Sequence, residues 1–343
     1  MGRIFCRAAV AALAMQAGIA AAQGLSPTAS VSANGVFFWV DGSHRSINLP
    51  TYSLGVHTAD PVTFTDLGPI QAFKPRVTGQ AINGGIGFVL PEGNFPAILG
   101  SNLRIGLTGG YIRADATQTA YATTSAPIQM WLDGTLFFGC GCEYWTNLAT
   151  DYSGWRFGIN AASDLQIGSV TFTPSIEVVT GTVRVRQTLT QLDSFEVYNS
   201  YTKLKWSDLG IKLGMSATMP IATMFEFGVS GTVAVVHRRA SLAGNDMLAD
   251  LVGGPLLATF IDTSEHTWAI VPAAQVQFIF IPASQVQIRA FGGVEWDSRV
   301  PGIVSPHFAP DQFFTFTGSP ATIGFSGQTS YFVGGGLTYA FNR

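Results

Sequence analysis

Small and apolar residues alternate along the last stretch of the chain, residues 331–341, which reads YFVGGGLTYAF. Every second residue from Phe341 back to Tyr331 is apolar or glycine, with aromatic residues at both ends, and the other face is mostly small or weakly polar. A period of two residues is typical of a β-strand whose two sides have different surroundings. An apolar face of about ten residues, capped by aromatics, matches a strand that crosses a bilayer.

Similar segments recur along the chain and predict ten strands. They cover residues 31–40, 76–90, 103–113, 152–162, 169–186, 206–219, 223–237, 267–281, 285–297 and 331–341. The connections alternate between long and short, which is typical of outer-membrane barrels with external loops and short periplasmic turns. An even number of strands lets the terminal strands pair and close the sheet. The polar segments 187–205 and 238–265 are interpreted as external loops.

A twelve-strand barrel is the alternative. The loops at residues 49–65 and 119–138 could each contain a hairpin.

The first 22 residues resemble a secretory signal, so residues 23–343 are predicted to form the barrel domain. Arg3 and Arg7 precede an apolar core of about a dozen residues, which is too short for a helix that spans a membrane. The small residues before Gln23 fit a cleavage site. The signal predicts export from the cytoplasm.

Composition supports one all-β membrane domain. Charged residues make up 11% of the chain, against roughly 25% in a typical soluble domain. No run of 18 apolar residues follows the signal, which excludes a helical span, and in lipid only helices and closed sheets satisfy every backbone polar group. The net charge of −3, without a basic patch in the sequence pattern, argues against a nucleic-acid partner. The partner we expect is outer-membrane lipid, and no cofactor is indicated.

The terminal stretch ending in Phe341 resembles the closing strand of bacterial outer-membrane β-barrel proteins, which usually ends on an aromatic residue. The resemblance is to the class and to no specific family within it. It implies an antiparallel up-and-down barrel in the outer membrane of a Gram-negative bacterium.

Alternation also assigns side chains to the lipid or to the lumen. On the strand 285–297, Ile288 is expected to face lipid and Arg289 to face the lumen, since neighbouring residues of a strand point to opposite sides. The predicted lumen charge network consists of Arg104, Arg156, Glu177, Lys212, Glu226 and Arg289. These residues either pair to plug the lumen or line a narrow conduit for small polar solutes.

Aromatic residues gather near the predicted strand ends. Indole and phenol rings favour the membrane interface, where one edge is wet and the body is dry. The predicted interface girdle consists of Trp39, Trp155, Trp206, Trp268 and Trp296 at the external rim, and of Tyr339 and Phe341 at the periplasmic rim.

Cys140 and Cys142 are the thiol pair of the mature chain and lie in a predicted external loop. In an oxidising compartment a disulfide is expected between them, with free thiols or a weak metal site as the alternatives.

Two functional hypotheses remain. The first is a passive surface or scaffold protein, or a narrow pore. The second is a hydrolase at the external rim, since a barrel of this size is similar to the omptin proteases and the rim offers Asp208, His237, His266 and Asp297. No segment matches the omptin motifs, and no Gly-x-Ser-x-Gly motif or metal-binding histidine pair is present, so no catalytic or metal-binding residue is predicted.

Overall fold

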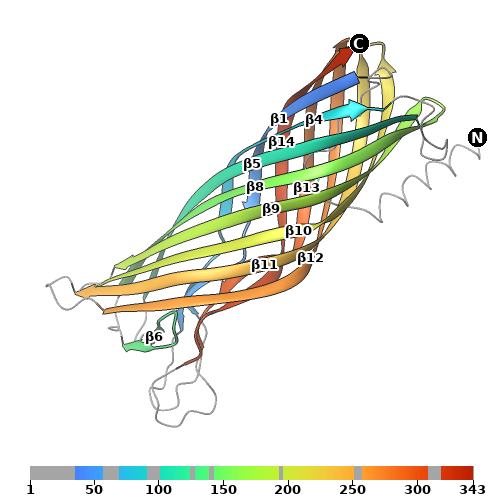
Figure 1. Cartoon of the computed structure of the whole chain (residues 1–343). Coiled ribbons are helices and arrows are strands. Elements are labelled where there is room, and N and C mark those ends of the chain that lie inside the picture. Colours follow the sequence, from blue (N-terminus) through green and yellow to red (C-terminus); the bar gives the residue numbers. More distant parts are fainter. Residues whose placement is uncertain are drawn as a thin grey trace, which may run out of the picture.

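Ten strands form one closed antiparallel barrel in a computed structural model of the chain (Figure 1). The structure describes residues 35–56, 69–90, 101–123, 128–138, 143–192, 196–250, 257–307 and 318–342. The barrel strands are β1 (Gly35–Asn48), β4 (Arg76–Val89), β5 (Ser101–Thr123), β8 (Glu143–Ile167), β9 (Val170–Leu192), β10 (Glu196–Ala222), β11 (Phe225–Asp250), β12 (Leu257–Ala283), β13 (Val286–Val304) and β14 (Thr322–Asn342). Within these ranges no helix is long and apolar enough to cross a membrane.

Closure joins the two ends of the described chain. β1 pairs with β14 on one side and with β4 on the other, and Phe38 lies opposite Tyr339 in this register. The predicted pairing of the first and last strands is therefore confirmed. Every strand of the ring then has two neighbours, and β12 pairs with β13 from Ala273 to its turn end. Closure of this kind removes most of the unpaired sheet edge from the bilayer.

Two further hairpins lie outside the ring, one within the predicted loop 119–138 and one that begins in the predicted loop 49–65 and ends beyond it. β2 (Tyr52–Val56) pairs with β3 (Pro69–Phe73), and β6 (Ile128–Met130) pairs with β7 (Leu136–Phe138). Both belong to connections at the same end of the barrel, which we call the loop end. The opposite end carries short turns, such as the one at Gly168 (φ 65°) between β8 and β9, and we call it the turn end.

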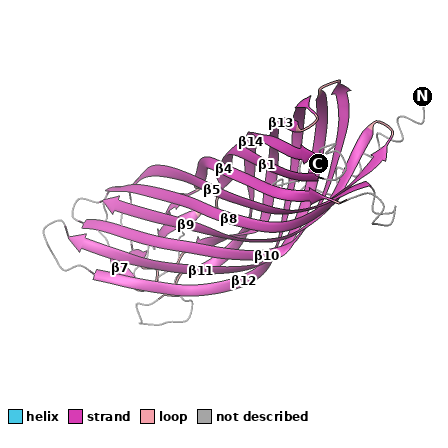
Figure 2. Ribbon diagram, turned by 45° about the horizontal axis from the view of Figure 1, so that its top comes forward, coloured by secondary structure: helices cyan, strands magenta, loops and turns pink. Residues whose placement is uncertain are grey.

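The strands are longer than the sequence pattern predicts. β9 ends at Leu192 and β10 begins at Glu196, so most of the predicted loop 187–205 is strand. β11 and β12 likewise replace most of the loop 238–265. Figure 2 shows β8 to β12 as long ribbons lying side by side. The loop interpretation was wrong because the outward positions there are polar, which ends the lipid-facing pattern without ending the strand.

Apolar side chains change sides along β10. Leu209, Ile211 and Leu213 point outward and are half exposed, whereas Leu204 and Trp206, nearer the loop end, point inward and are buried. The outward positions beside them carry lysine and serine. Lipid therefore surrounds one part of this strand and water the other, because apolar faces turn toward whichever side is dry.

An apolar belt surrounds the barrel on the turn-end side of this change. Its outward, exposed members include Ile86, Leu107, Phe157, Ile176, Leu209, Ile211, Met215, Ile270, Phe278, Ile288, Val333 and Leu337. Side chains of this kind on a closed ring are typical of strands in lipid. The protein is a transmembrane β-barrel of the bacterial outer membrane.

The loop end of the barrel is filled by an apolar core. Tyr52 and Phe73 from the β2–β3 hairpin, and Trp131 and Leu132 beside the β6–β7 hairpin, pack against inward side chains of the wall. The wall side chains are Ile47, Val77, Leu148, Val185, Leu189, Leu204, Trp206, Leu242, Val300 and Ile323. Both hairpins therefore fold into the barrel and act as a plug.

Candidate functional site

Buried ion pairs join nearby strands on the lumen side of the wall at the level of the apolar belt. Lys212 on β10 forms an ion pair with Glu177 on β9, and both side chains are almost inaccessible to solvent. Thr108 on β5 donates its hydroxyl to the other oxygen of Glu177 at 2.5 Å. A buried charge persists only where a partner and hydrogen bonds compensate the loss of water, and the wall supplies both here.

A second pair joins Arg289 on β13 to Asp41 on β1. The guanidinium donates twice, from Nε at 3.0 Å and from Nη2 at 2.5 Å. Its Cζ also lies 5.5 Å from the ring centre of Trp39, within the range of a cation–π contact. The bidentate geometry fixes the orientation of both side chains.

Near the turn end, Arg104 donates to Asp164 at 2.6 Å. The same carboxylate oxygen accepts a hydrogen bond from Thr173 at 2.8 Å. This pair ties β5 to β8 near the end of the barrel opposite the plug.

At the loop-end limit of the belt, Arg238 is clamped by two carboxylates. Asp208 accepts from Nε and Nη2 at 2.8 Å each, and Asp297 accepts from Nη1 at 3.0 Å. The backbone oxygen of Arg299 accepts a further bond at 2.7 Å, and the ring of Trp206 lies 5.8 Å from Cζ. All donors of this guanidinium are thus engaged in holding β10, β11 and β13 together.

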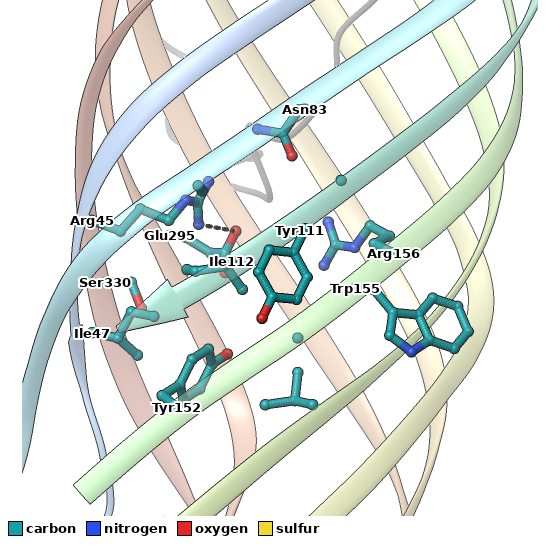
Figure 3. Close-up of a pocket in the computed structure, with 14 residues that line it drawn as sticks. Arg45, Ile47, Asn83, Tyr111, Ile112, Tyr152, Trp155, Arg156, Glu295 and Ser330 are labelled. Carbon is teal, nitrogen blue, oxygen red and sulfur yellow. Dashed lines mark ion pairs between the residues drawn. The ribbon is translucent and has the colours of Figure 1, made fainter. Parts of the chain in front are cut away.

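A small polar cavity lies among these layers, as Figure 3 shows. Its volume is about 80 Å³, and Arg45, Tyr152, Arg156 and Glu295 line it. Arg45 reaches Glu295 at 4.0 Å, while one terminal nitrogen of Arg156 has no hydrogen-bond partner among the described residues. The cavity has room for a few water molecules and not for an organic substrate.

The structure places the predicted lumen residues in three different settings. Arg104, Glu177, Lys212 and Arg289 form buried ion pairs. Arg156 lines the cavity without an ion-pair partner in the described chain. The prediction that Glu226 joins the lumen charge network was wrong. Glu226 lies partly exposed at the turn end with no ion pair to the described residues, because its strand begins at Phe225 beside the turn.

Sequence reasoning missed Asp41, Arg45 and Asp164. Asp41 and Arg45 lie just past the predicted end of the first strand, and Asp164 lies in a predicted turn. The alternation of the strand could have revealed Asp41 and Arg45 if it had been continued past residue 40. Asp41 is two residues from Trp39 and four from Arg45, so all three lie on the same face.

The predicted external girdle is corrected at two of its five tryptophans. Trp39 and Trp206 are 3% and 4% exposed and point into the lumen, whereas Trp155, Trp268 and Trp296 point outward. Strand position alone misplaced the first two, because their neighbours Phe38, Lys205 and Ser207 occupy the outward parity. At the turn end, Tyr339 and Phe341 pack on Phe38 with ring centres 5.7 and 5.9 Å away.

The acid and base groups of the rim lie on opposite sides of the wall. Asp208 and Asp297 point inward to Arg238, while His237 and His266 point outward with ring centres 6.1 Å apart. A general base must reach its partner within about 2.6–3.2 Å, and the wall separates these groups. No three His, Cys, Asp or Glu side chains of the described ranges gather as a metal-binding group. Cys140 and Cys142 lie outside the described residues, so the disulfide stays a prediction.

Asp246 on β11 anchors the plug. The backbone amide of Leu132 donates to its carboxylate at 2.6 Å, and Tyr198 and Ser200 lie on the facing strand. The hydroxyl of Tyr52 lies 3.3 Å from that of Ser200, so both hairpins meet the wall here. Asp246 is inaccessible and lies well beyond the apolar belt. Burial raises the pKa of Asp246 to about 6, and hydrogen bonding, first of all from Leu132, offsets this only in part.

We expect the plug to be held more firmly at pH 5 than at pH 7.5. The folded-state pKa of Asp246 is raised from 3.8 to about 6, so its contribution to stability is complete below about pH 4 and is lost as the pH rises through 6. Amide hydrogen exchange of residues 128–138, corrected for intrinsic rates, should lose protection by up to about one order of magnitude between pH 5 and pH 7.5. Asp246→Asn should flatten this dependence. An equal dependence in the variant and the parent would rule out Asp246 as its source.

No family model and no curated protein sequence matches the chain. Among solved structures, the chain is similar to the outer membrane protease OmpT from Escherichia coli, with 11% identity, a TM-score of 0.46 and coverage of 94% of this chain and 100% of that one. The chain is also similar to the translocator domain of the autotransporter NalP from Neisseria meningitidis, with 11% identity, a TM-score of 0.35 and coverage of 89% of this chain and 88% of that one. An outer membrane channel from Pseudomonas putida has 6% identity to the chain and a TM-score of 0.34, and the match covers 93% of this chain and 100% of the channel.

Proposed function

We propose that the protein is a non-conducting surface protein of the outer membrane, a plugged barrel that serves as a rigid scaffold. The observation that carries this proposal is the apolar core inside the loop end, where Trp131 and Leu132 pack against the wall side chains Leu189 and Leu242. An ion that crosses a membrane protein needs water or polar ligands along its whole path. A dry core of this kind supplies neither.

The ion pairs below the plug support the same proposal. Lys212, Arg238 and Arg289 each face a carboxylate in direct contact. A selective pore is built from a ring of one sign that attracts one kind of ion. Charges that neutralise one another between nearby strands stabilise the wall and do not form such a ring.

The rim geometry favours this role over the alternative of a rim hydrolase. The two carboxylates Asp208 and Asp297 are held by Arg238, and the histidines face the other side of the wall. A general base must reach its partner within hydrogen-bond distance, and the oxygens of these two carboxylates are turned toward Arg238.

Single-channel recording of the refolded protein in planar bilayers tests the proposal. The parent protein should give no steady openings, with insertion verified by the change in gel mobility on heating that closed barrels show. Trp131→Ala combined with Leu132→Ala should admit water into the plug and produce brief openings. Steady openings of the parent protein would refute the scaffold proposal and favour the narrow pore.

A further inference from the structure

Four cations lie together on the outer wall, on the loop-end side of the apolar belt. This basic quartet consists of Arg184 and Arg186 on β9 and of Lys203 and Lys205 on β10. The register sets Arg184 directly opposite Lys205 and Arg186 directly opposite Lys203. All four occupy outward positions, since the residues between them, such as Val185 and Leu204, are buried in the lumen.

Like charges directly opposite each other on paired strands are destabilising. Within the described chain, the four side chains form no ion pair or hydrogen bond, and Nε of Arg184 is shielded from solvent without a partner. The nearest carboxylate in register is Asp151 on β8, opposite Arg186, and it is not within ion-pair distance. One carboxylate cannot balance four cations, so the quartet is suited to an anion from outside the chain.

An apolar groove lies on the turn-end side of the quartet and extends along the same wall from β10 to β4. Its volume is about 540 Å³, within the range of roughly 300–1,000 Å³ for pockets that hold organic ligands. The groove arises where two outward glycines, Gly84 and Gly109, lie opposite each other in register between larger apolar side chains. Its lining also includes Phe157, Thr180 and Leu209.

The groove and the quartet are continuous along two strands. Thr180 is four residues from Arg184 on β9, and Leu209 is four residues from Lys205 on β10, which corresponds to roughly 13 Å. The groove lies in the apolar belt and the quartet just beyond it, where lipid headgroups begin. The two features together match a molecule with an anionic head and an apolar tail.

We propose that this wall binds a phosphorylated glycolipid of the external leaflet, with its phosphate groups on the basic quartet and an acyl chain in the groove. A second copy of the chain does not fit as well, because a two-fold contact would set the quartet against itself. A soluble anion would leave the groove unused. Arginine binds phosphate through paired N–H donors, and lysine adds charge.

Native mass spectrometry of the refolded protein in neutral detergent, titrated with diphosphoryl lipid A, tests the proposal. Arg184→Gln combined with Lys205→Gln should weaken binding at least tenfold. The matched control, Arg76→Gln combined with Arg299→Gln, removes two exposed cations from β4 and β13, away from the quartet and the groove, and should change binding less than twofold. Equal weakening by both double variants would overturn the site, because it would reduce binding to net charge.

Two further measurements separate the head from the tail. Dephosphorylated lipid A should bind the parent at least tenfold more weakly than the diphosphoryl form, and equal binding would overturn the role of the quartet. Gly109→Ile fills the groove, with Phe157 shifting slightly because a Cβ at residue 109 would lie 3.2 Å from its ring. This variant should weaken the binding of lipid A severalfold and leave the binding of inorganic phosphate unchanged. Unaltered binding of lipid A would overturn the role of the groove.

A readout of stability guards against misfolded variants. Without lipid, Arg184→Gln with Lys205→Gln should unfold at the same or a higher denaturant concentration than the parent, because it relieves a like-charge contact. When lipid A is added, the stability of the parent against denaturant should increase, and that of the double variant should not. A double variant that is less stable without lipid would show that the quartet serves the fold, and would overturn the proposal.

Discussion

Lys212→Met is expected to destabilise the folded barrel by about 3–5 kcal/mol, because it leaves the carboxylate of Glu177 charged and buried in the lumen. The loss of one partner is costlier than the loss of both, since an unpaired charge keeps its full desolvation penalty. Thr108 donates a neutral hydrogen bond to Glu177, which cannot replace the cation. The measurement is the folded fraction against denaturant, followed by gel mobility without heating.

The rescue variant makes this expectation specific. Lys212→Met combined with Glu177→Gln removes both charges and should recover most of the lost stability. Lys205→Met changes the same residue type at an outward, exposed position of β10 and should alter stability by no more than about 0.5 kcal/mol. If Lys212→Met proves as mild as Lys205→Met, water reaches the pair and the lumen is not sealed.

The second large effect concerns the lipid side of the same strand. Leu213→Arg places a cation against the hydrocarbon near the middle of the apolar belt, at an expected cost of about 2–4 kcal/mol. We expect its folding yield in lipid vesicles to fall well below that of the parent. In detergent micelles the difference should shrink, because a micelle deforms around a charge more easily than a bilayer.

Tyr201→Arg is the control for position along the strand. Tyr201 points outward on β10 as Leu213 does, but it lies beyond the belt, near Lys203. Its substitution should leave the folding yield in vesicles nearly unchanged. An equal loss at both positions would place the lipid boundary nearer the loop end than the change of apolar side on β10 indicates.

Strand parity was readable from the sequence. Val333 and Leu337 lie outward on β14 with Phe332 inward, and Ile288 lies outward on β13 with Arg289 inward, as the alternation predicts. Successive residues of a strand face lipid and the packed lumen in turn, so each position requires a different kind of side chain from its neighbour. A shift by one residue would move every side chain to the wrong face. The count of ten strands followed from the same pattern and from the alternating connection lengths.

Strand ends were not readable in the same way. On β9 the apolar residues are outward at Ile176 and Val178 and inward at Val185 and Leu189. A search for one apolar face sees this inversion as the end of a strand and the start of a polar loop. The inversion is itself the mark of the lipid boundary, and it is present in the sequence once two environments are allowed along one strand.

The sequence by itself determined the class of the fold, the number of crossings and the side of the wall on which most residues lie, because these depend on local alternation against lipid. Only the tertiary structure decided which charges meet and what fills the barrel. Arg289 and Asp41 pair across 248 residues because closure sets β13 and β1 on either side of β14. The plug likewise depends on hairpins whose own residues show no preference for the lumen until Asp246, Leu189 and Leu242 offer them an anchor and a dry surface. Partners so distant along the chain are chosen by the geometry of the closed ring, which no local pattern encodes.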